Sequence, residues 1–247
     1  MGEALDRARP PAPVGPSPWA LPDPAALRDG GSGDGLVGVG ADLAVETVVD
    51  AYRRGIFPWP HSGLPLPWFS PDPRAVIPAG AVHCARSLRR RLRQSGWTTT
   101  ADAAFDDVVA ACAKRPRFEG TWITRGMRGA YGRLHRLGWA ESVEVWDERG
   151  RLVGGIYGVR VGACFTGESM FHRATDASKV ALLDLGARWS EAGGSMIDVQ
   201  LPTDHLRTMG AVEVPRAEFL ARLAAARDQV VCMRTGRMPV SRLAPAR

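Results

Sequence analysis

Cysteine is scarce in this sequence, and long apolar runs are missing. The four cysteines form no Cys-x-x-Cys pair, which excludes a zinc ribbon and a thioredoxin-like redox motif. The five histidines have no metal-ligand spacing either, so we expect no metal site. No stretch approaches the roughly 20 apolar residues that span a bilayer. Reduced core thiols in a reducing compartment best explain the scattered cysteines, which are Cys84, Cys112, Cys164 and Cys232.

The sequence also lacks an apolar block at its N-terminus, and its positive and negative charges do not balance. Without the apolar block the first residues do not resemble a signal peptide, so we expect a soluble, cytoplasmic protein. Acidic residues are outnumbered, since 32 Lys and Arg face 26 Asp and Glu and leave a net charge of +6. That excess suggests an anionic partner, but a merely basic surface explains it equally well.

Pro and Gly are abundant at the start of the chain, and its last residues contain Pro and Arg. We expect residues 1–35 to form a loose N-terminal segment and residues 236–247 a loose tail. Two glycine motifs lie at the end of this N-terminal segment. One is a dinucleotide-type motif at 33–38, and the other is an acetyl-CoA-type motif at 28–33. Neither follows a predicted strand, so we interpret neither as a phosphate-binding loop.

Between the ends, the apolar periodicity predicts an α+β arrangement. Residues 142–171 alternate as antiparallel strands with a turn at 147–150. The elements predicted after them are a helix at 178–192, a strand at 196–200, a short helix at 203–209, a strand at 212–214 and a helix at 216–227. Upstream, we expect helices capped by Asp42, Asp102 and Thr124, and another at 82–96.

Polar residues interrupt two of the predicted strands. Glu168 lies in one, and Asp198 and Gln200 lie in the other. Because residues two apart share a strand face, we expect Glu168 beside Met170 and Asp198 beside Gln200. A carboxylate or amide on a buried strand needs hydrogen-bond partners or a catalytic task. The pattern indicates an active site at the centre of the sheet, or else a structural hydrogen-bond pair that fixes a loop.

Two more features suit a nucleic acid. Trp59, Trp68 and Phe69 lie on a stiff Pro-rich loop, where their rings can stack on a nucleobase or simply pack as a small core on the preceding helix. Five arginines fall within eight residues of the helix predicted at 82–96, with no acid among them. Such a run exceeds what a solvated face requires and suits a phosphate backbone. The five are Arg86, Arg89, Arg90, Arg91 and Arg93.

Several sequence blocks occur in order along the chain. They include Ala51-Tyr-Arg-Arg-Gly-Ile-Phe-Pro-Trp59, Trp68-x-Ser-Pro-Asp-Pro-Arg74, Phe165-x-Gly-Glu-Ser-Met-Phe171 and Ile197-Asp-x-Gln200. Over residues 35–223 these blocks make the chain resemble the bacterial leucyl/phenylalanyl-tRNA–protein transferases. The resemblance implies an α+β fold with a small N-terminal domain at 36–74 and a GNAT-like (acyl-CoA N-acyltransferase-like) domain at 75–235. The second domain is expected to have a mostly antiparallel central sheet flanked by helices.

The same resemblance implies an aminoacyltransferase. Enzymes of this family move Leu or Phe, and less readily Met, from the tRNA to the N-terminal Arg or Lys of a protein. The product is marked for degradation through the N-degron pathway. The implied partners are therefore Leu-tRNA or Phe-tRNA and a protein or peptide acceptor, and no metal or small cofactor is implied.

The resemblance also assigns roles to residues. Asp198 and Gln200 match the catalytic pair, with Asp198 orienting and polarising the Gln200 amide, and Glu168 matches a carboxylate that receives the acceptor's cationic N-terminus. The implied pocket for the donor side chain consists of Ile156, Gly167, Met170, Leu182, Leu185 and Ile197. The residues implied in binding the tRNA and its terminal adenosine are Tyr52, Trp59, Trp122, Tyr131, Arg86, Arg89, Arg90 and Arg93. Departures from the family pattern at His172, Leu185 and Thr203 leave the preference between Leu and Phe open.

Three other functions explain less of the sequence. An acetyl-CoA-dependent N-acetyltransferase of the same fold needs a Gly-rich loop after the central strand, and residues 172–178 contain no glycine. A non-catalytic RNA-binding module leaves Glu168, Asp198 and Gln200 without a task. A serine hydrolase needs a second glycine after its nucleophile, which Gly167-Glu-Ser-Met-Phe171 lacks.

Overall fold

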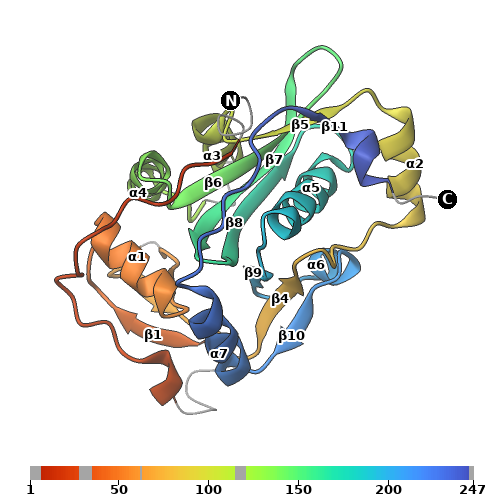
Figure 1. Cartoon of the computed structure of the whole chain (residues 1–247). Coiled ribbons are helices and arrows are strands. Elements are labelled where there is room, and N and C mark those ends of the chain that lie inside the picture. Colours follow the sequence, from red (N-terminus) through yellow and green to blue (C-terminus); the bar gives the residue numbers. More distant parts are fainter. Residues whose placement is uncertain (1–6, 28–34, 62, 115–120, 245–247) are drawn as a thin grey trace.

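Two sheets organise the protein (Figure 1). The computed structural model describes residues 7–27, 35–61, 63–114 and 121–244. The smaller sheet is antiparallel, with β3 (Pro67–Phe69) between β1 (Leu36–Val39) and β2 (Phe57–Pro58). Helix α1 (Val45–Arg53) joins β1 to β2. It buries Val48, Val49 and Tyr52, which recur at helical spacing in its sequence.

The larger sheet has the strand order β10-β4-β9-β8-β7-β6-β5-β11 over the described residues. Neighbouring strands are antiparallel except β8 and β9, which run parallel and are joined by a helical crossover. Strand β4 follows the small sheet directly and pairs with β9. The bounds are β4 (Arg74–Pro78), β5 (Thr98–Ala101), β6 (Ala140–Trp146), β7 (Leu152–Val161), β8 (Cys164–His172), β9 (Met196–Gln200), β10 (Val212–Val214) and β11 (Met238–Pro239).

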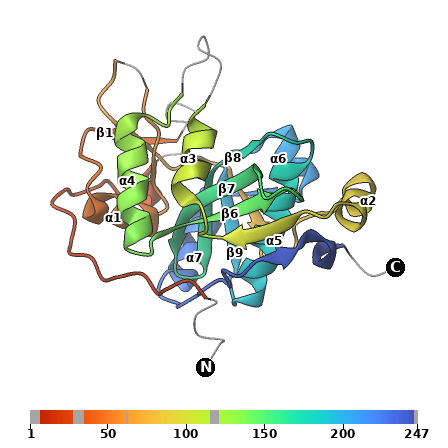
Figure 2. The ribbon, with the colours of Figure 1, turned by 90° about the horizontal axis from the view of Figure 1, so that it is seen from above.

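Helices cover both faces of the large sheet (Figures 1 and 2). Two adjacent glycines on β7 show how closely the helices approach the sheet. A Cβ on Gly154 would lie 2.6 Å from Ala177, and a Cβ on Gly155 would lie 3.0 Å from Val108. Helix α5 (Ala177–Glu191) therefore packs on one face and α3 (Phe105–Ala113) on the other. The other helices of the described ranges are α2 (Arg86–Gln94), α4 (Arg125–Arg136), α6 (Asp204–Thr208), α7 (Arg216–Ala226) and the 3₁₀ turns η2 (Pro24–Ala26) and η3 (Val240–Leu243).

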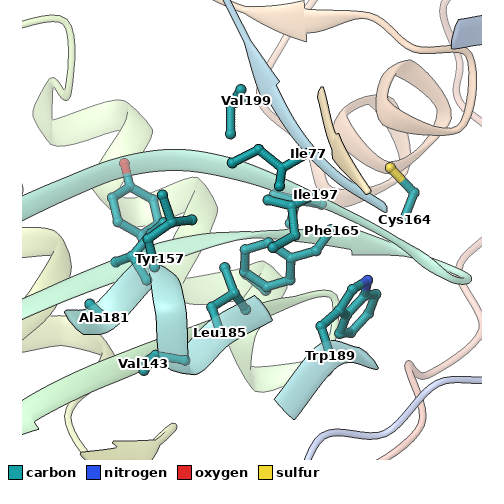
Figure 3. Close-up of a cluster of buried hydrophobic side chains, with 14 of the residues drawn as sticks. Ile77, Val143, Tyr157, Cys164, Phe165, Ala181, Leu185, Trp189, Ile197 and Val199 are labelled. Atoms are coloured by element: carbon teal, nitrogen blue, oxygen red, sulfur yellow. The ribbon is translucent and has the colours of Figure 1, made fainter. Parts of the chain in front are cut away.

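A cluster of buried apolar side chains lies between α5 and the sheet (Figure 3). Trp189 of α5 packs there with Phe165 of β8 and Ile197 of β9. The rings of Phe165 and Trp189 meet edge to face, with centroids 5.5 Å apart. The indole N–H of Trp189 is shared between the carbonyls of Ala163 and Met196, each 3.2 Å away. This packing fixes β8 against β9, the two strands that carry the candidate catalytic residues.

The predicted α+β fold is confirmed, and each strand expected from residue 142 onward is present. Thr124 caps α4 as predicted, since its hydroxyl accepts the Met127 N–H. Two caps are wrong, because the helices expected after Asp42 and Asp102 have alanines at their N-cap positions. The helix predicted at 82–96 begins only at residue 86. Among the described residues, no helix is long and apolar enough to cross a lipid bilayer.

Both chain ends are anchored where the structure describes them. Residues 236–244 contain β11 and η3, and Val240 is fully buried, so the prediction of a loose tail is wrong for this part. In the N-terminal segment, the carbonyl of Ala12 accepts the indole N–H of Trp139 at 2.9 Å. These contacts join residues far apart in sequence, which composition alone does not reveal. The glycine motif at 28–33 and the start of the motif at 33–38 lie outside the described residues.

Candidate active site

Glu168 lies at a β-bulge in β8. Tyr157 of β7 pairs with Ser169, but the next residue of β7 pairs with Gly167, so Glu168 is the extra residue between these pairs. The bulge turns Glu168 toward α1 and α4, while Met170 continues the regular alternation and faces the other way. The prediction that Glu168 lies beside Met170 is therefore wrong, because the bulge breaks the alternation on which it rested.

Three side chains donate hydrogen bonds to Glu168. The hydroxyl of Tyr52 lies 2.7 Å from Oε1, the hydroxyl of Tyr131 lies 2.6 Å from Oε2, and Nε2 of Gln200 lies 3.0 Å from Oε1. These donors come from α1, α4 and β9, and Glu168 itself is 9% exposed. Burial raises the pKa of Glu168 to about 7, although the two tyrosine hydroxyls act in the opposite direction.

Asp198 and Gln200 meet through the backbone. The Gln200 N–H donates to Asp198 Oδ1 at 3.0 Å, and Gln200 has a left-handed backbone conformation with φ of +64°. This turn falls where the pairing of β4 with β9 shifts register. The expectation that Asp198 contacts the Gln200 side-chain amide differs from the structure, in which that amide donates to Glu168.

Asp198 is fully buried and is paired with Arg74, which is not among the predicted site residues. Nε and Nη2 of Arg74 lie 2.8 and 2.7 Å from the two carboxylate oxygens. The hydroxyl of Thr166 also donates to Oδ2, at 3.1 Å. Both oxygens of Asp198 are thus engaged inside the protein. The sequence did contain a signal, since Arg74 is a charged residue at the start of the apolar strand Arg74-Ala-Val-Ile77.

A cavity of about 90 Å³ lies beside Glu168 and Gln200. Its walls include Trp59 and Trp122, both half-buried. Tyr52 and Tyr131 are only 3% and 0% exposed, so their rings have no free face for a base. Of the four aromatic residues assigned to the terminal adenosine, the two tryptophans line the cavity and the two tyrosines hold Glu168. The other lining residues are Phe57, Pro58 and Leu201.

The six residues assigned to the donor side-chain pocket do not line this cavity. Leu182, Leu185 and Ile197 are fully buried, and Figure 3 shows the last two in the core under α5. The others lie on β7 and β8 near the bulge and are Ile156, Gly167 and Met170. Their role as a pocket stays a prediction.

The arginine-rich helix α2 lies on the side of the molecule away from α1 and α4 (Figures 1 and 2). Arg91 pairs with Asp176 at 3.0 Å. The four arginines assigned to tRNA are exposed: Arg86, Arg89, Arg90 and Arg93. The structure therefore does not bring them to the cavity, and a ligand that touches both places must extend across the molecule. Within the described ranges, no group of three or more His, Cys, Asp or Glu side chains forms a metal site.

The chemistry of the cavity suits transfer of an acyl group to an amine. A buried carboxylate with a pKa near neutrality can accept a proton from an amine, and an amide and two hydroxyls fix its orientation. Aromatic walls can hold a flat ring beside it. The fold and the site together indicate an enzyme of the acyltransferase class.

Comparison with known proteins identifies the family. The family model for leucyl/phenylalanyl-tRNA protein transferase matches residues 76–224, and the model for the N-terminal domain of that protein matches residues 41–72. The chain is 50% identical over 212 residues to the leucyl/phenylalanyl-tRNA–protein transferase of Anaeromyxobacter sp. (strain K), with 85% of this chain and 89% of the relative covered. It is 48% identical over 216 residues to that of Salmonella heidelberg (strain SL476), covering 87% and 90%. The chain belongs to the leucyl/phenylalanyl-tRNA–protein transferase family, as the sequence blocks predicted.

Proposed function

We propose that this enzyme takes Leu or Phe, and less readily Met, from its tRNA and attaches it to the N-terminal Arg or Lys of a protein. The product then carries the N-terminal residue that directs it to the N-degron pathway. A cytoplasmic location is part of the proposal, because aminoacyl-tRNA is used there. The observation that best supports this reaction is Glu168, held by Tyr52, Tyr131 and Gln200 beside an aromatic cavity.

Glu168 is the proton acceptor in this proposal. The aminoacyl ester is already reactive, so the enzyme mainly positions the substrates and removes a proton. The acceptor α-amine titrates near ~8, and the pKa of Glu168 is about 7, a suitable match. Among the described residues, Oε2 of Glu168 accepts a hydrogen bond only from Tyr131, which leaves room for the amine. The neutral amine attacks the ester carbon, Glu168 accepts the proton that the amine loses, and Glu168 then gives that proton to the departing ribose oxygen, so that the carboxylate is restored.

Gln200 and Asp198 have separate tasks. Nε2 of Gln200 donates to Glu168, so its carbonyl oxygen can accept a hydrogen bond from the attacking amine. A neutral amide is a poor proton acceptor, so Gln200 orients the amine and Glu168 takes the proton. Both oxygens of Asp198 are engaged by Arg74 and its neighbours, so Asp198 supports Gln200 without touching the substrate.

The tRNA is held at two places. Trp59 and Trp122 line the cavity and provide the stacking surface for the terminal adenosine. The exposed arginines of α2 contact phosphates elsewhere on the tRNA, at a distance that only a large ligand spans. The donor side chain enters past Gly167 and Met170, which are half-buried, and the flexible Met170 adjusts to Leu or Phe.

One assay tests this function. The protein is mixed with Leu-tRNA labelled on leucine and a peptide that begins with Arg, and we expect label in the peptide. Matched peptides that begin with Ala, or whose N-terminal Arg is acetylated, should stay unlabelled. No label in the Arg peptide, or equal label in the Ala peptide, would contradict the proposal. Acetyl-CoA in place of the tRNA should give no product, and an acetylated peptide would support the N-acetyltransferase alternative.

A further inference from the structure

Arg74 lies where four parts of the chain meet. It is the first residue of β4 and is 1% exposed. Its Nη1 donates to the carbonyl of Gly55 at 3.3 Å, and its guanidinium carbon lies 4.9 Å from the ring centroid of Phe57 and 4.5 Å from that of Phe219. Its two hydrogen bonds to Asp198 complete these surroundings. Arg74 thus connects the turn after α1, strand β2, helix α7 and strand β9.

The Arg74–Asp198 pair contacts the backbone at Gln200. Oδ1 of Asp198 accepts from both Nε of Arg74 and the N–H of Gln200. Gln200 has a positive φ, which residues other than glycine seldom adopt, and this hydrogen bond supports it. The side-chain amide of Gln200 then reaches Glu168, 3.0 Å away. A continuous series of hydrogen bonds therefore runs from Arg74 through Asp198 and Gln200 to Glu168.

We propose that Arg74 is a positioning residue for aminoacyl transfer: it clamps Asp198, which holds the Gln200 backbone and so keeps the amide on Glu168. This inference rests on the proposed function, in which Gln200 orients the attacking amine. The fork of a guanidinium fixes both the position and the plane of a carboxylate, which a lysine ammonium does not do. Because Gly55 and Phe57 belong to the small-sheet part of the chain, Arg74 also couples the docking of that part to the geometry of the site.

A double-mutant cycle with Arg74→Lys and Gln200→Ala tests the inference. Gln200→Ala should lower kcat about 100-fold and Arg74→Lys about tenfold, with the KM for aminoacyl-tRNA within about threefold of wild type. In the Gln200→Ala background, Arg74→Lys should have no further effect on kcat, because the group that it positions is already gone. Effects that multiply would overturn the inference, and so would a wild-type kcat in Arg74→Lys.

A pair of double variants separates positioning from stability. Arg74→Met/Asp198→Leu replaces the buried ion pair with apolar side chains, a change that is often tolerated in folding. The matched control is Arg160→Met/Glu141→Leu, at an equally buried pair with Nη1 of Arg160 2.9 Å from Oε1 of Glu141. By thermal melting and transfer kinetics, we expect kcat to fall about 100-fold in the first and less than about threefold in the control. Equal kcat values in the two would overturn the inference.

A failure of the Arg74→Lys variant to fold would differ from a failure of the wild type to transfer an aminoacyl group. If Arg74→Lys fails to melt cooperatively, the role of Arg74 is structural and the inference is overturned. If the wild-type protein transfers no aminoacyl group at all, the proposed function fails instead. The two failures are therefore distinguishable.

Discussion

Glu168 and Asp198 are both buried carboxylates, but their partners differ. Asp198 is paired with the guanidinium of Arg74, whose charge compensates its own. Glu168 accepts hydrogen bonds from neutral donors, two hydroxyls and an amide, and burial raises its pKa to about 7. A carboxylate that titrates near neutrality can carry a proton during a reaction. A carboxylate whose two oxygens are both held by an arginine is suited to holding a neighbouring residue of the site in place.

Glu168→Gln should lower kcat about 100-fold, because the amide keeps the shape of the carboxylate but does not accept a proton. In the wild type, kcat/KM should rise as the pH increases through about 7, where Glu168 loses its proton. This rise should be absent from the variant, while the rise from the acceptor amine near pH ~8 remains. Transfer rates across this pH range measure both effects. Glu144→Gln, at another buried carboxylate, is the control, and wild-type rates in Glu168→Gln would exclude the proton-acceptor role.

The same substitution should alter the pH dependence of folding. The pKa of Glu168 is raised in the folded state from 4.5 to about 7, so the unfolded chain releases this proton first as the pH rises. The contribution of Glu168 to stability is therefore complete below about pH 4.5 and is lost through about pH 7. Relative to Glu168→Gln, the wild type should lose about 3 kcal/mol over this interval. Urea unfolding of the wild type and the variant at pH 5 and pH 8 measures this loss. If the two proteins differ in stability by the same amount at both pH values, the pKa of Glu168 is not raised.

Tyr131→Phe should shift the pH dependence of kcat/KM. Removal of the hydroxyl takes away a donor that favours the ionised carboxylate, so the pKa of Glu168 rises further. The rise in kcat/KM should move to higher pH by about one unit. Tyr157→Phe is the matched control, since the Tyr157 hydroxyl is buried without a hydrogen-bond partner among the described residues. A shift of equal size in the control would mean that the Tyr131 hydroxyl is not the cause.

At the scale of elements, two breaks in regular strand pairing create the site. The bulge in β8 turns Glu168 toward α1 and α4, and the register shift between β4 and β9 accompanies the left-handed turn at Gln200. With regular alternation, Glu168 would share the face of Met170. The irregularities therefore bring side chains from α1, α4, β8 and β9 to one point.

Helix α2 is expected to contribute to binding and not to chemistry. Replacing Arg86 and Arg90 by Gln should weaken tRNA binding and lower the slope of log affinity against log salt by about one per lost phosphate contact. At saturating tRNA, kcat should stay within about twofold of wild type, because α2 lies far from α1 and α4 (Figure 1). Filter binding at several salt concentrations measures the slope. Arg149→Gln, at an exposed arginine of the 147–150 turn, is the control, and an unchanged slope in the α2 variant would place the tRNA elsewhere.

Across the whole molecule, both ends of the chain support the large sheet. Strand β11 pairs with β5, and η3 packs between α2 and α5 (Figure 1). Nη2 of Arg242 lies 2.6 Å from the buried carboxylate of Asp184. On β7, Arg160 donates to the carbonyls of Arg9 and Val231, and so ties the N-terminal segment to the C-terminal one. The described residues near both ends are therefore part of the folded unit.

Val240→Ala should destabilise the protein by about 2 kcal/mol, because Val240 is 0% exposed and its truncation leaves unfilled space between helices. Val230→Ala is the matched control. Val230 is 74% exposed, so the same change there should alter the free energy of unfolding by less than about 0.5 kcal/mol. Chemical denaturation of the two variants measures both values, and equal losses would show that the tail packs differently in solution.

Local sequence predicted those features that depend on neighbouring residues. The hydroxyl of Thr124 accepts the Met127 N–H at the start of α4, and Gly138 takes the positive φ that ends it. The strands around Glu168 and at 196–200 were also predictable, because alternation and turn residues are visible in a short window. The predicted caps at Asp42 and Asp102 are wrong because α1 and α3 begin two residues or more later, after alanines. Asp42 instead accepts the N–H of Ala44 and the hydroxyl of Thr47, and Asp102 accepts the N–H of Ser142.

The sequence by itself determined the family and the residue types of the site, since both are carried by ordered blocks along the chain. Only the tertiary structure decided how they act together. Arg74 is separated from Asp198 by 124 positions, and Tyr52 from Glu168 by 116. The bulge that turns Glu168 depends on its partner strand, and the raised pKa of its carboxylate depends on burial by α1 and α4. Such long-range pairing and desolvation have no local pattern, so they become visible only when the chain is folded.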